Sequence, residues 1–195
     1  MKLTAKRLLI FVLIALLSVS FGFGYDAAAT AIEKHRYPQP QRFSALVYEQ
    51  AEAFGVPSNV IFSVILCESD FVSDALSEDG AVGLMQITPK QMEAVYTEIL
   101  HEPIPDAGIL YDPKTNLRVG VARLSHLYQI YGVWDTVYAA WHAGEAAVDN
   151  WLLDESCLNE QGQLTNIPKR ETAKFVSRAK KSAEMYSKLY SNQRR

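Results

Sequence analysis

Apolar side chains recur at helical spacing through almost the whole chain from Phe43 onwards. Between Phe43 and Phe54 they follow the i, i+3, i+4 pattern that places them on one face of an α-helix, and Gly55 is a typical residue just after a helix end. No alternation of apolar and polar residues is long enough to predict a sheet, and no segment is repeated. The sequence therefore predicts a single, mainly α-helical domain.

Capping residues divide this domain into its predicted helices. Ser58 is the expected N-cap of the second helix, and Pro89 is expected as the first residue of the third. The clearest helix begins at Asp112 and ends before Gly132. Gly120 lies in its middle, where glycine costs about 1 kcal/mol against alanine, so we expect it to pack closely against another helix. The predicted helices cover about 43–54, 58–68, 89–101, 113–131, 134–143, 145–153 and 168–190.

The N-terminal residues 1–24 have the composition of a targeting segment, with three basic residues, no acidic one and an apolar run over 8–23. Two alternatives stay open. Small residues at 27–31 suit cleavage of a signal peptide, whereas an apolar run of roughly 18 residues is near the minimum for an uncleaved membrane anchor. In both cases the rest of the chain is expected to be exported and extracytoplasmic. Residues 25–42 are predicted to form a linker, and 43–195 the domain.

The exported part is acidic, because removing the three positive charges of residues 1–24 changes the formal net charge from −3 to −6. An acidic domain without a basic run is a poor candidate for binding nucleic acid or anionic lipid. Its two cysteines, Cys67 and Cys157, match no disulfide framework or zinc site, and sequence alone leaves their pairing open. Cys67 is expected to be a small buried core residue. We expect a monomer without a metal or cofactor.

Glu68 lies on the apolar face of its predicted helix. It stands at i+7 after three apolar residues at i, i+3 and i+4, which are Ile61, Val64 and Ile65. A carboxylate on such a face is partly desolvated unless it is paired, which raises its pKa. A carboxyl group protonated near neutral pH can donate its proton to a glycosidic oxygen. On this feature alone, a glutamate that reaches solvent or pairs with a base is an open alternative.

The stretch after Glu68 is dense in small and polar residues. Gly83 suits a tight backbone turn close to a ligand. Ser69, Ser77 and Gln86 offer hydroxyl and amide groups near the carboxylate. This composition predicts the rim of a sugar-binding site. The alternative is a loop whose serines cap neighbouring helices.

Residues 68–89 resemble the signature of soluble-type lytic transglycosylases, in which Glu-Ser is followed by Phe, Ala, Ser, Gly-Ala, and Gly-Leu-Met-Gln-Ile with a proline two residues on. Three later segments are similar to further motifs of that family, in the same order. They are 112–120 (Asp-Pro…Asn…Gly), 139–144 (Ala-Ala-Tyr-Asn-Ala-Gly in the family) and 167–176 (Ile-Pro…Glu-Thr…Tyr-Val in the family). The resemblance implies a lysozyme-like helical domain with a cleft that holds a glycan strand.

The resemblance also implies a function and a set of site residues. Glu68 matches the catalytic glutamate, and the family's cleft hydroxyl, methionine and glutamine match Ser77, Met85 and Gln86. The implied reaction cuts the β-1,4 bond between N-acetylmuramic acid and N-acetylglucosamine in peptidoglycan and leaves 1,6-anhydromuramic acid ends. Glu68 would act first as the acid and then as the base, so no second carboxylate, metal or cofactor is needed.

This sequence departs from the family pattern at three aromatic or polar positions. Trp141 and His142 stand where the family has Tyr-Asn, and Phe175 replaces a tyrosine whose phenol can bond the catalytic glutamate. Trp141 keeps an aromatic face for a sugar and one N–H donor, and His142 is either a substrate-binding residue or a satisfied core histidine. If His142 lies near Glu68, its charge lowers the pKa of the glutamate at acidic pH.

Two alternatives to a lytic transglycosylase stay open. These departures favour one of them, a non-catalytic peptidoglycan-binding protein that kept the fold. The other is a hydrolase of the goose-type lysozyme kind, which has the same fold but uses water as the nucleophile. The partner in every case is a peptidoglycan glycan strand, with the membrane as a second partner if the N-terminal segment is not cleaved.

Overall fold

The computed structural model describes residues 13–14 and 24–191, which fall into two compact units, one ending at Pro38 and the other beginning at Gln39. The predicted targeting segment, 1–24, lies almost entirely outside the described residues. In the first unit residues 24–36, most of which belong to the predicted linker, form a helix, because their alanines favour helix and Pro38 then ends it. No helix in the described part of the chain is both long and apolar enough to cross a membrane.

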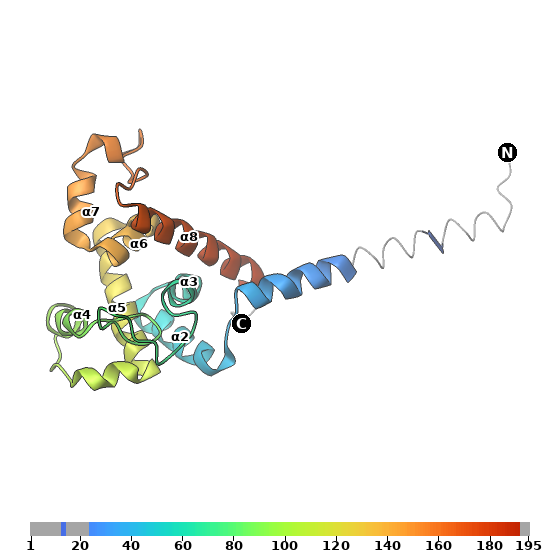
Figure 1. Cartoon of the computed structure of the whole chain (residues 1–195), viewed down its shortest axis with the longest axis horizontal. Coiled ribbons are helices and arrows are strands. Elements are labelled where there is room, and N and C mark those ends of the chain that lie inside the picture. The colour runs from blue at the N-terminus through green and yellow to red at the C-terminus, as the bar shows by residue number, and fades with distance from the viewer. Residues whose placement is uncertain (1–12, 15–23, 192–195) are drawn as a thin grey trace. The chain divides into compact units, whose positions relative to one another are not determined.

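The second unit is built from helices, as predicted, and its described residues form isolated β-bridges but no strand (Figure 1). The described part of this unit contains eight helices and two short 3-10 helices, η2 and η3. In chain order they are α2 (Gln41–Phe54), α3 (Ser58–Glu68), α4 (Pro89–Ala94), the π-helix η1 (Val95–Leu100), η2 (Ala107–Tyr111), α5 (Pro113–Tyr131), α6 (Trp134–Ala143), α7 (Glu145–Leu152), η3 (Glu155–Cys157) and α8 (Arg170–Tyr190).

Most helix ends match the capping residues in the sequence. Asp112 accepts the backbone N–H of Thr115 at 2.9 Å and so caps α5, and Gly132 ends that helix with φ 68°. Pro89 is the first residue of α4, which passes directly into η1 and stops at His101. The predicted N-cap role of Ser58 is wrong. Pro57 holds that position, because its extended backbone already presents its carbonyl to the N–H of Val60.

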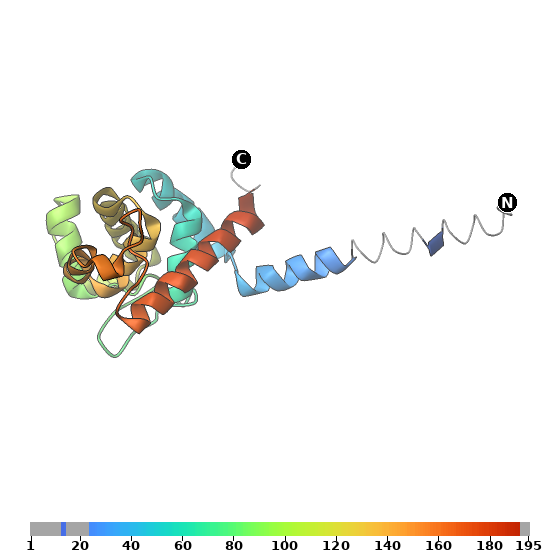
Figure 2. The same cartoon turned by 90° about the horizontal axis from the view of Figure 1, so that it is seen from above.

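α3 is the central helix of this unit and lies beside α8, as Figures 1 and 2 show. Its middle residues are completely buried, and Phe62 stacks on Tyr186 of α8 with ring centres 5.4 Å apart. Burial of such side chains stabilises the fold by about 2 kcal/mol each. Because α3 is so firmly enclosed, its last residue, Glu68, has a fixed position at the end of a buried helix.

Two core predictions need correction. Gly120 was expected to pack against another helix, but a side chain at this position would overlap Met85, which belongs to the loop between α3 and α4. The glycine is therefore required by the loop. Cys67 was expected in the core and is only half-buried, whereas Cys157 is buried. Both thiols are free.

Candidate active site

The carboxyl group of Glu68 is withdrawn from water at the C-terminal end of α3. Burial is the largest influence on it and raises its pKa above the ordinary value of 4.5, as its place on the apolar face predicts. Trp141 on α6 donates its Nε1–H to Oε1 of Glu68 at 2.7 Å. This bond and the positive charges of Arg123 and Arg178 lower the pKa, but less than burial raises it. The group is thus a partly desolvated acid with one directed donor.

Trp141 is largely shielded from solvent and directs its N–H at Glu68. Only 5% of the residue is exposed, and the guanidinium of Arg123 lies 4.8 Å from the centre of its ring. Arg123 also donates to the Trp141 carbonyl at 3.4 Å. The indole therefore offers little area for the sugar stacking that the sequence predicts, and its N–H is directed at the carboxylate.

The loop from Ser69 to Thr88 is fixed by its own polar side chains. Ser69, which is 9% exposed, donates its hydroxyl to the Leu84 carbonyl at 2.8 Å. Gln86 donates its amide to the Gly83 carbonyl at 3.0 Å and the Ala75 carbonyl at 3.3 Å. The hydroxyl of Ser77 accepts the backbone N–H of Ala81 at 2.9 Å. Ser77 and Gln86 remain half-buried and reachable, whereas Ser69 ties the loop to the end of α3.

Asn116 of α5 holds the same loop from behind. It is completely buried; its amide oxygen accepts the N–H of Met85 at 2.8 Å and its Nδ2 donates to the carbonyls of Val82 and Leu110 at 2.8 and 3.0 Å. Gly83 has φ 78°, and a side chain there would overlap the Asn116 amide. Met85, predicted to line the cleft, is fully buried. Its contribution to a site is to support the loop.

The backbone of this loop is strained next to the carboxylate. Asp70, Phe71 and Gln86 adopt positive φ values of 49°, 63° and 48°. Non-glycine residues in this conformation cost on the order of 1 kcal/mol or more, and they concentrate at functional sites. The hydrogen bonds of Asn116 offset this strain and leave the loop little conformational freedom. A rigid loop beside a desolvated acid is suited to binding a polar ligand.

His142 faces away from Glu68 and towards α8. Its Nδ1 lies 3.0 Å from Oγ1 of Thr172, and its ring lies 4.9 Å from that of Phe175. Burial, helped by the charge of Lys169, lowers its pKa. The positive charges that act on Glu68 come from Arg123 and Arg178. His142 is therefore not among the groups that shift the pKa of Glu68, so the condition under which the sequence predicts such an effect is not met.

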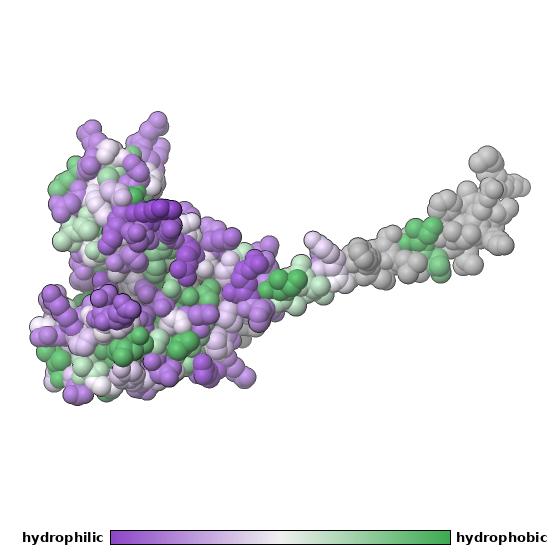
Figure 3. Space-filling model, viewed as in Figure 1, coloured by the Kyte–Doolittle hydropathy of each residue, from purple (hydrophilic) through white to green (hydrophobic). Residues whose placement is uncertain are grey.

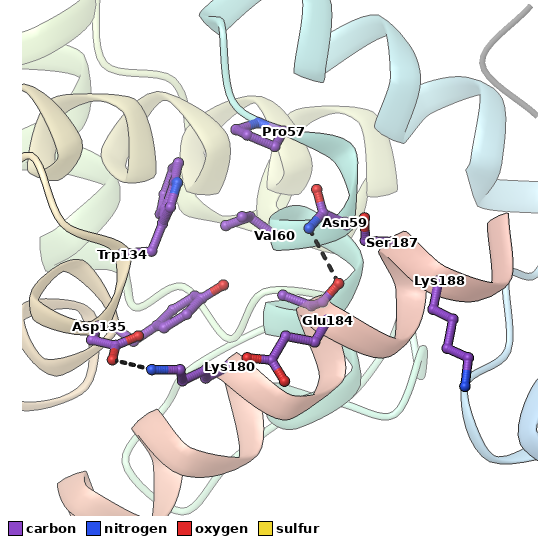
Figure 4. Close-up of a pocket in the computed structure, with 11 residues that line it drawn as sticks. Pro57, Asn59, Val60, Trp134, Asp135, Lys180, Glu184, Ser187 and Lys188 are labelled. Atoms are coloured by element: carbon purple, nitrogen blue, oxygen red, sulfur yellow. Dashed lines mark hydrogen bonds and ion pairs between the residues drawn. The ribbon is translucent and has the colours of Figure 1, made fainter. Parts of the chain in front are cut away.

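Two hollows flank this part of the molecule. A pocket of about 200 Å³ lies between α4, α5 and α7 and includes Arg123 and Glu145 in its lining. Figure 3 shows the outline of the second unit indented between the lobes that carry α4 and α7. A larger groove of about 560 Å³ lies at the opposite end of α3, where Trp134, Tyr138 and Lys180 line it (Figure 4). The larger hollow is thus not the one near Glu68.

The described residues contain no group of three or more histidine, cysteine, aspartate or glutamate side chains placed to hold a metal ion. The groups that shift the pKa of Glu68, apart from burial, are Trp141, Arg123 and Arg178, and none of them is a carboxylate. The arrangement is that of a single acid with cationic and indole partners.

Comparison with known proteins places this site in a family. The family model described as the transglycosylase SLT domain matches residues 45–162, which is more than half of the chain. The chain belongs to the transglycosylase SLT domain family. The matched region includes Glu68, the loop after it, Asn116, Arg123 and Trp141.

Relatives and solved structures agree with this membership. Membrane-bound lytic murein transglycosylase C of Salmonella arizonae is 26% identical over 108 residues, which is 55% of this chain and 30% of that protein. An inactive glutamate-to-glutamine mutant of lytic transglycosylase Slt from Pseudomonas aeruginosa is 31% identical, with a TM-score of 0.72 over 81% of this chain and 25% of that one. The 70-kDa soluble lytic transglycosylase SLT70 from Escherichia coli has the same fold, with a TM-score of 0.73, 24% identity, and coverage of 80% of this chain and 25% of that one.

The SLT-domain chain therefore spans about a third or less of the length of each of these proteins. The predicted family and the predicted mainly α, lysozyme-like fold are confirmed.

Arg123 is not among the predicted site residues, although the sequence contains an indication of it. It is an isolated cation in the otherwise apolar run 119–124 of α5, three residues after the glycine that packs on Met85.

Proposed function

We propose that this SLT-domain protein is a peptidoglycan lytic transglycosylase with Glu68 as its catalytic acid and base. One observation carries the proposal. The glutamate that occupies the family's catalytic position has a carboxyl group whose pKa is raised by burial and whose Oε1 accepts the Trp141 N–H at 2.7 Å. The matching relatives are named as lytic transglycosylases, which supports the same reaction class for this chain.

The proposed reaction moves one proton off Glu68 and one proton back. Protonated Glu68 gives its proton, from the oxygen opposite the Trp141 bond, to the bridging oxygen between N-acetylmuramic acid and N-acetylglucosamine. The bond from that oxygen to C1 of the muramyl residue breaks, and the N-acetyl group helps to stabilise the cationic carbon. Ionised Glu68 then takes the proton of the C6 hydroxyl, whose oxygen bonds to C1 and closes the 1,6-anhydro ring. No water is consumed.

The opposing effects on the pKa of Glu68 suit both the donation and the uptake of a proton. Burial raises the pKa, so a larger fraction of the carboxyl is protonated near neutral pH than for an exposed glutamate. The indole N–H and the charges of Arg123 and Arg178 stabilise the carboxylate that forms after the proton has left. A group that acts first as acid and then as base needs a pKa close to the working pH.

We further propose roles for the remaining predicted site residues. Ser77 and Gln86 contact the glycan from the half-buried rim of the loop, and His142 contacts it from the exposed end of α6. Ser69, Met85 and Trp141 act from behind the surface by fixing the loop and the carboxylate.

The proposed setting is outside the cytoplasm, with a glycan strand as the substrate and with no nucleic-acid partner. Residues 1–24 are proposed to direct export as a signal peptide or membrane anchor, 25–42 to connect, and 43–195 to form the catalytic domain. The basic, then apolar, composition of the N-terminal segment supports this, as does a relative named as membrane-bound. Gel mobility of the exported protein beside a version lacking residues 1–24 distinguishes a cleaved from an uncleaved segment.

Mass spectrometry of purified peptidoglycan after digestion tests the reaction. Fragments that end in 1,6-anhydromuramic acid are the expected products. Reducing muramic acid ends would replace the proposal with hydrolysis of the goose-type lysozyme kind. Strands that stay intact while the protein co-sediments with them would make it a non-catalytic glycan-binding protein.

A further inference from the structure

Arg123 is a cation in an unfavourable place. Its neighbours in the helix, Val121, Ala122 and Leu124, are completely buried, and burial is the largest influence on Arg123 and lowers its pKa. The charges of Glu145 and Glu68 oppose that effect. Arg123 is half-buried, and partial desolvation of a guanidinium is unfavourable unless nearby groups compensate for the lost water. The contacts of Arg123 show what this position provides.

The contacts of Arg123 converge on Trp141. The guanidinium carbon lies 4.8 Å from the indole centre, and Nη2 donates to the backbone carbonyl of the same residue at 3.4 Å. One planar group thus restrains both the ring and the backbone of Trp141. The indole can rotate about its side-chain bonds only by losing the contact with this cation.

The restraint matters because the carboxylate depends on the indole N–H. Trp141 supplies the donor to Oε1 of Glu68 at 2.7 Å. Phe175, which lies against His142, has no polar atom with which to bond the carboxylate. An N–H to a carboxylate is strong and directional only while donor and acceptor stay aligned.

We propose that Arg123 is a positioning residue for Glu68, which it serves by holding the indole of Trp141 so that the Nε1–H stays on the carboxylate while the proton leaves and returns. The effect on rate rests on the proposed function. The effect on the carboxyl group itself does not, because it is a property of the protein without substrate.

The charged and titratable groups around Glu68 define the matched control. Cys67 is its neighbour on α3, Arg123 faces it from α5 and Arg178 faces it from α8. Both arginines lower the pKa of Glu68, but only Arg123 contacts Trp141. Arg178→Met therefore removes a positive charge without loosening the indole.

The experiment combines Arg123→Met, Arg123→Lys, Arg178→Met and Trp141→Phe, alone and in pairs with Trp141→Phe. The pKa of Glu68 is followed without substrate by carboxyl ¹³C NMR, with Glu68→Gln assigning the signal. The turnover number, kcat, is measured on peptidoglycan as the release of anhydro ends. Thermal melting checks that each variant is folded, and Arg123→Lys carries the test if Arg123→Met does not fold.

If Arg123 acts through Trp141, Arg123→Met raises the pKa of Glu68 and lowers kcat by about tenfold, whereas in the Trp141→Phe background it changes kcat by less than about twofold. Arg123→Lys raises the pKa of Glu68 by less than Arg123→Met and still loses much of kcat, because lysine keeps the charge but not the planar contact that aligns the indole N–H. Arg178→Met raises the pKa, and its effect on kcat is the same in both backgrounds.

The proposal is overturned if Arg123→Met and Trp141→Phe multiply in their effects on kcat, or if Arg123→Met leaves the pKa of Glu68 unchanged. A wild-type protein that releases no anhydro ends would instead contradict the proposed function. In that case the NMR titrations still decide whether Arg123 and Trp141 act on Glu68 as one unit, through the dependence of the Arg123→Met shift on the indole.

Discussion

The two ends of α3 differ in size and in chemistry. At the N-terminal end lies a groove of about 560 Å³, lined by Trp134 and by an ion pair in which Lys180 approaches Asp135 to 2.7 Å (Figure 4). At the C-terminal end lies Glu68, near a pocket of only about 200 Å³ that includes Arg123 in its lining. The charges at the larger hollow form an exposed ion pair that water screens, whereas the carboxyl group of Glu68 at the other end is partly withdrawn from water.

This difference teaches that the volume of a hollow does not indicate the reactivity of the groups around it. Asp135 pairs with Lys180 in the wide groove, and this ion pair raises the pKa of the lysine further from neutrality, so Lys180 is not suited to proton transfer near pH 7. Burial acts in the opposite sense on Glu68, whose pKa moves towards neutrality. The site is defined by desolvation and one directed donor.

The largest expected effect compares one substitution at each end of α3. Glu68→Gln removes the only proton donor and acceptor of the proposed reaction and should lower the release of anhydro ends by at least about a thousandfold. Lys180→Met breaks the exposed ion pair at the other end, so it should leave the rate unchanged and cost less than about 1 kcal/mol in free energy of unfolding. Quantitative analysis of released fragments and chemical denaturation measure both. A similar loss of rate in the two variants would remove the distinction between the ends.

The second effect concerns the support of the loop at the Glu68 end. Asn116→Ala leaves the N–H of Met85 and the carbonyls of Val82 and Leu110 without their amide partner. Buried groups left unpaired cost about 1–3 kcal/mol each, and partial relaxation should hold the total near 3 kcal/mol. Urea denaturation measures the loss. A change below about 1 kcal/mol would mean that the loop does not depend on this residue.

The third effect is a dependence of stability on pH. The folded pKa of Glu68 lies above its ordinary value of 4.5, so the folded state binds more protons than the unfolded state between these two values. The contribution of Glu68 to stability therefore falls as pH rises through that window and stays unfavourable above it. Glu68→Gln, which cannot ionise, should melt at a higher temperature than the wild type at pH 7. The difference should vanish below about pH 4.

One result of these melting experiments would contradict the prediction. If Glu68→Gln melts at a lower temperature than the wild type at pH 7, the carboxylate is stabilised by Trp141, Arg123 and Arg178 more than burial disfavours it. The two ends of α3 would then both hold stabilised charges.

The smallest expected effect is at His142. Its Nδ1 lies 3.0 Å from the Thr172 hydroxyl, and burial lowers its pKa, so it carries little charge near neutral pH. His142→Asn should leave the alkaline limb of the pH–rate profile where it is in the wild type, because this limb reports the deprotonation of Glu68. A displaced limb would show that the histidine acts on the carboxylate after all.

The sequence determined the local features of this protein because each depends on near neighbours in the chain. The spacing of apolar residues determined the helices, Asp112 and Gly132 set the ends of α5, and the i+7 position of Glu68 placed it on the buried face with a raised pKa. The signature after Glu68 identified the family. The assignment of Ser58 as a cap failed because Pro57, one residue earlier, can start a helix equally well.

Only the tertiary structure decided which groups from distant segments meet. Trp141 lies 73 residues after Glu68, and periodicity on α6 does not show that its N–H points at the carboxylate while His142, the next residue, points at Thr172. Met85 is buried because α5 carries a glycine opposite it. Arg123 contacts the indole because α5 and α6 pack side by side. Such contacts depend on how helices cross in space, and spacing along one helix contains no information about that.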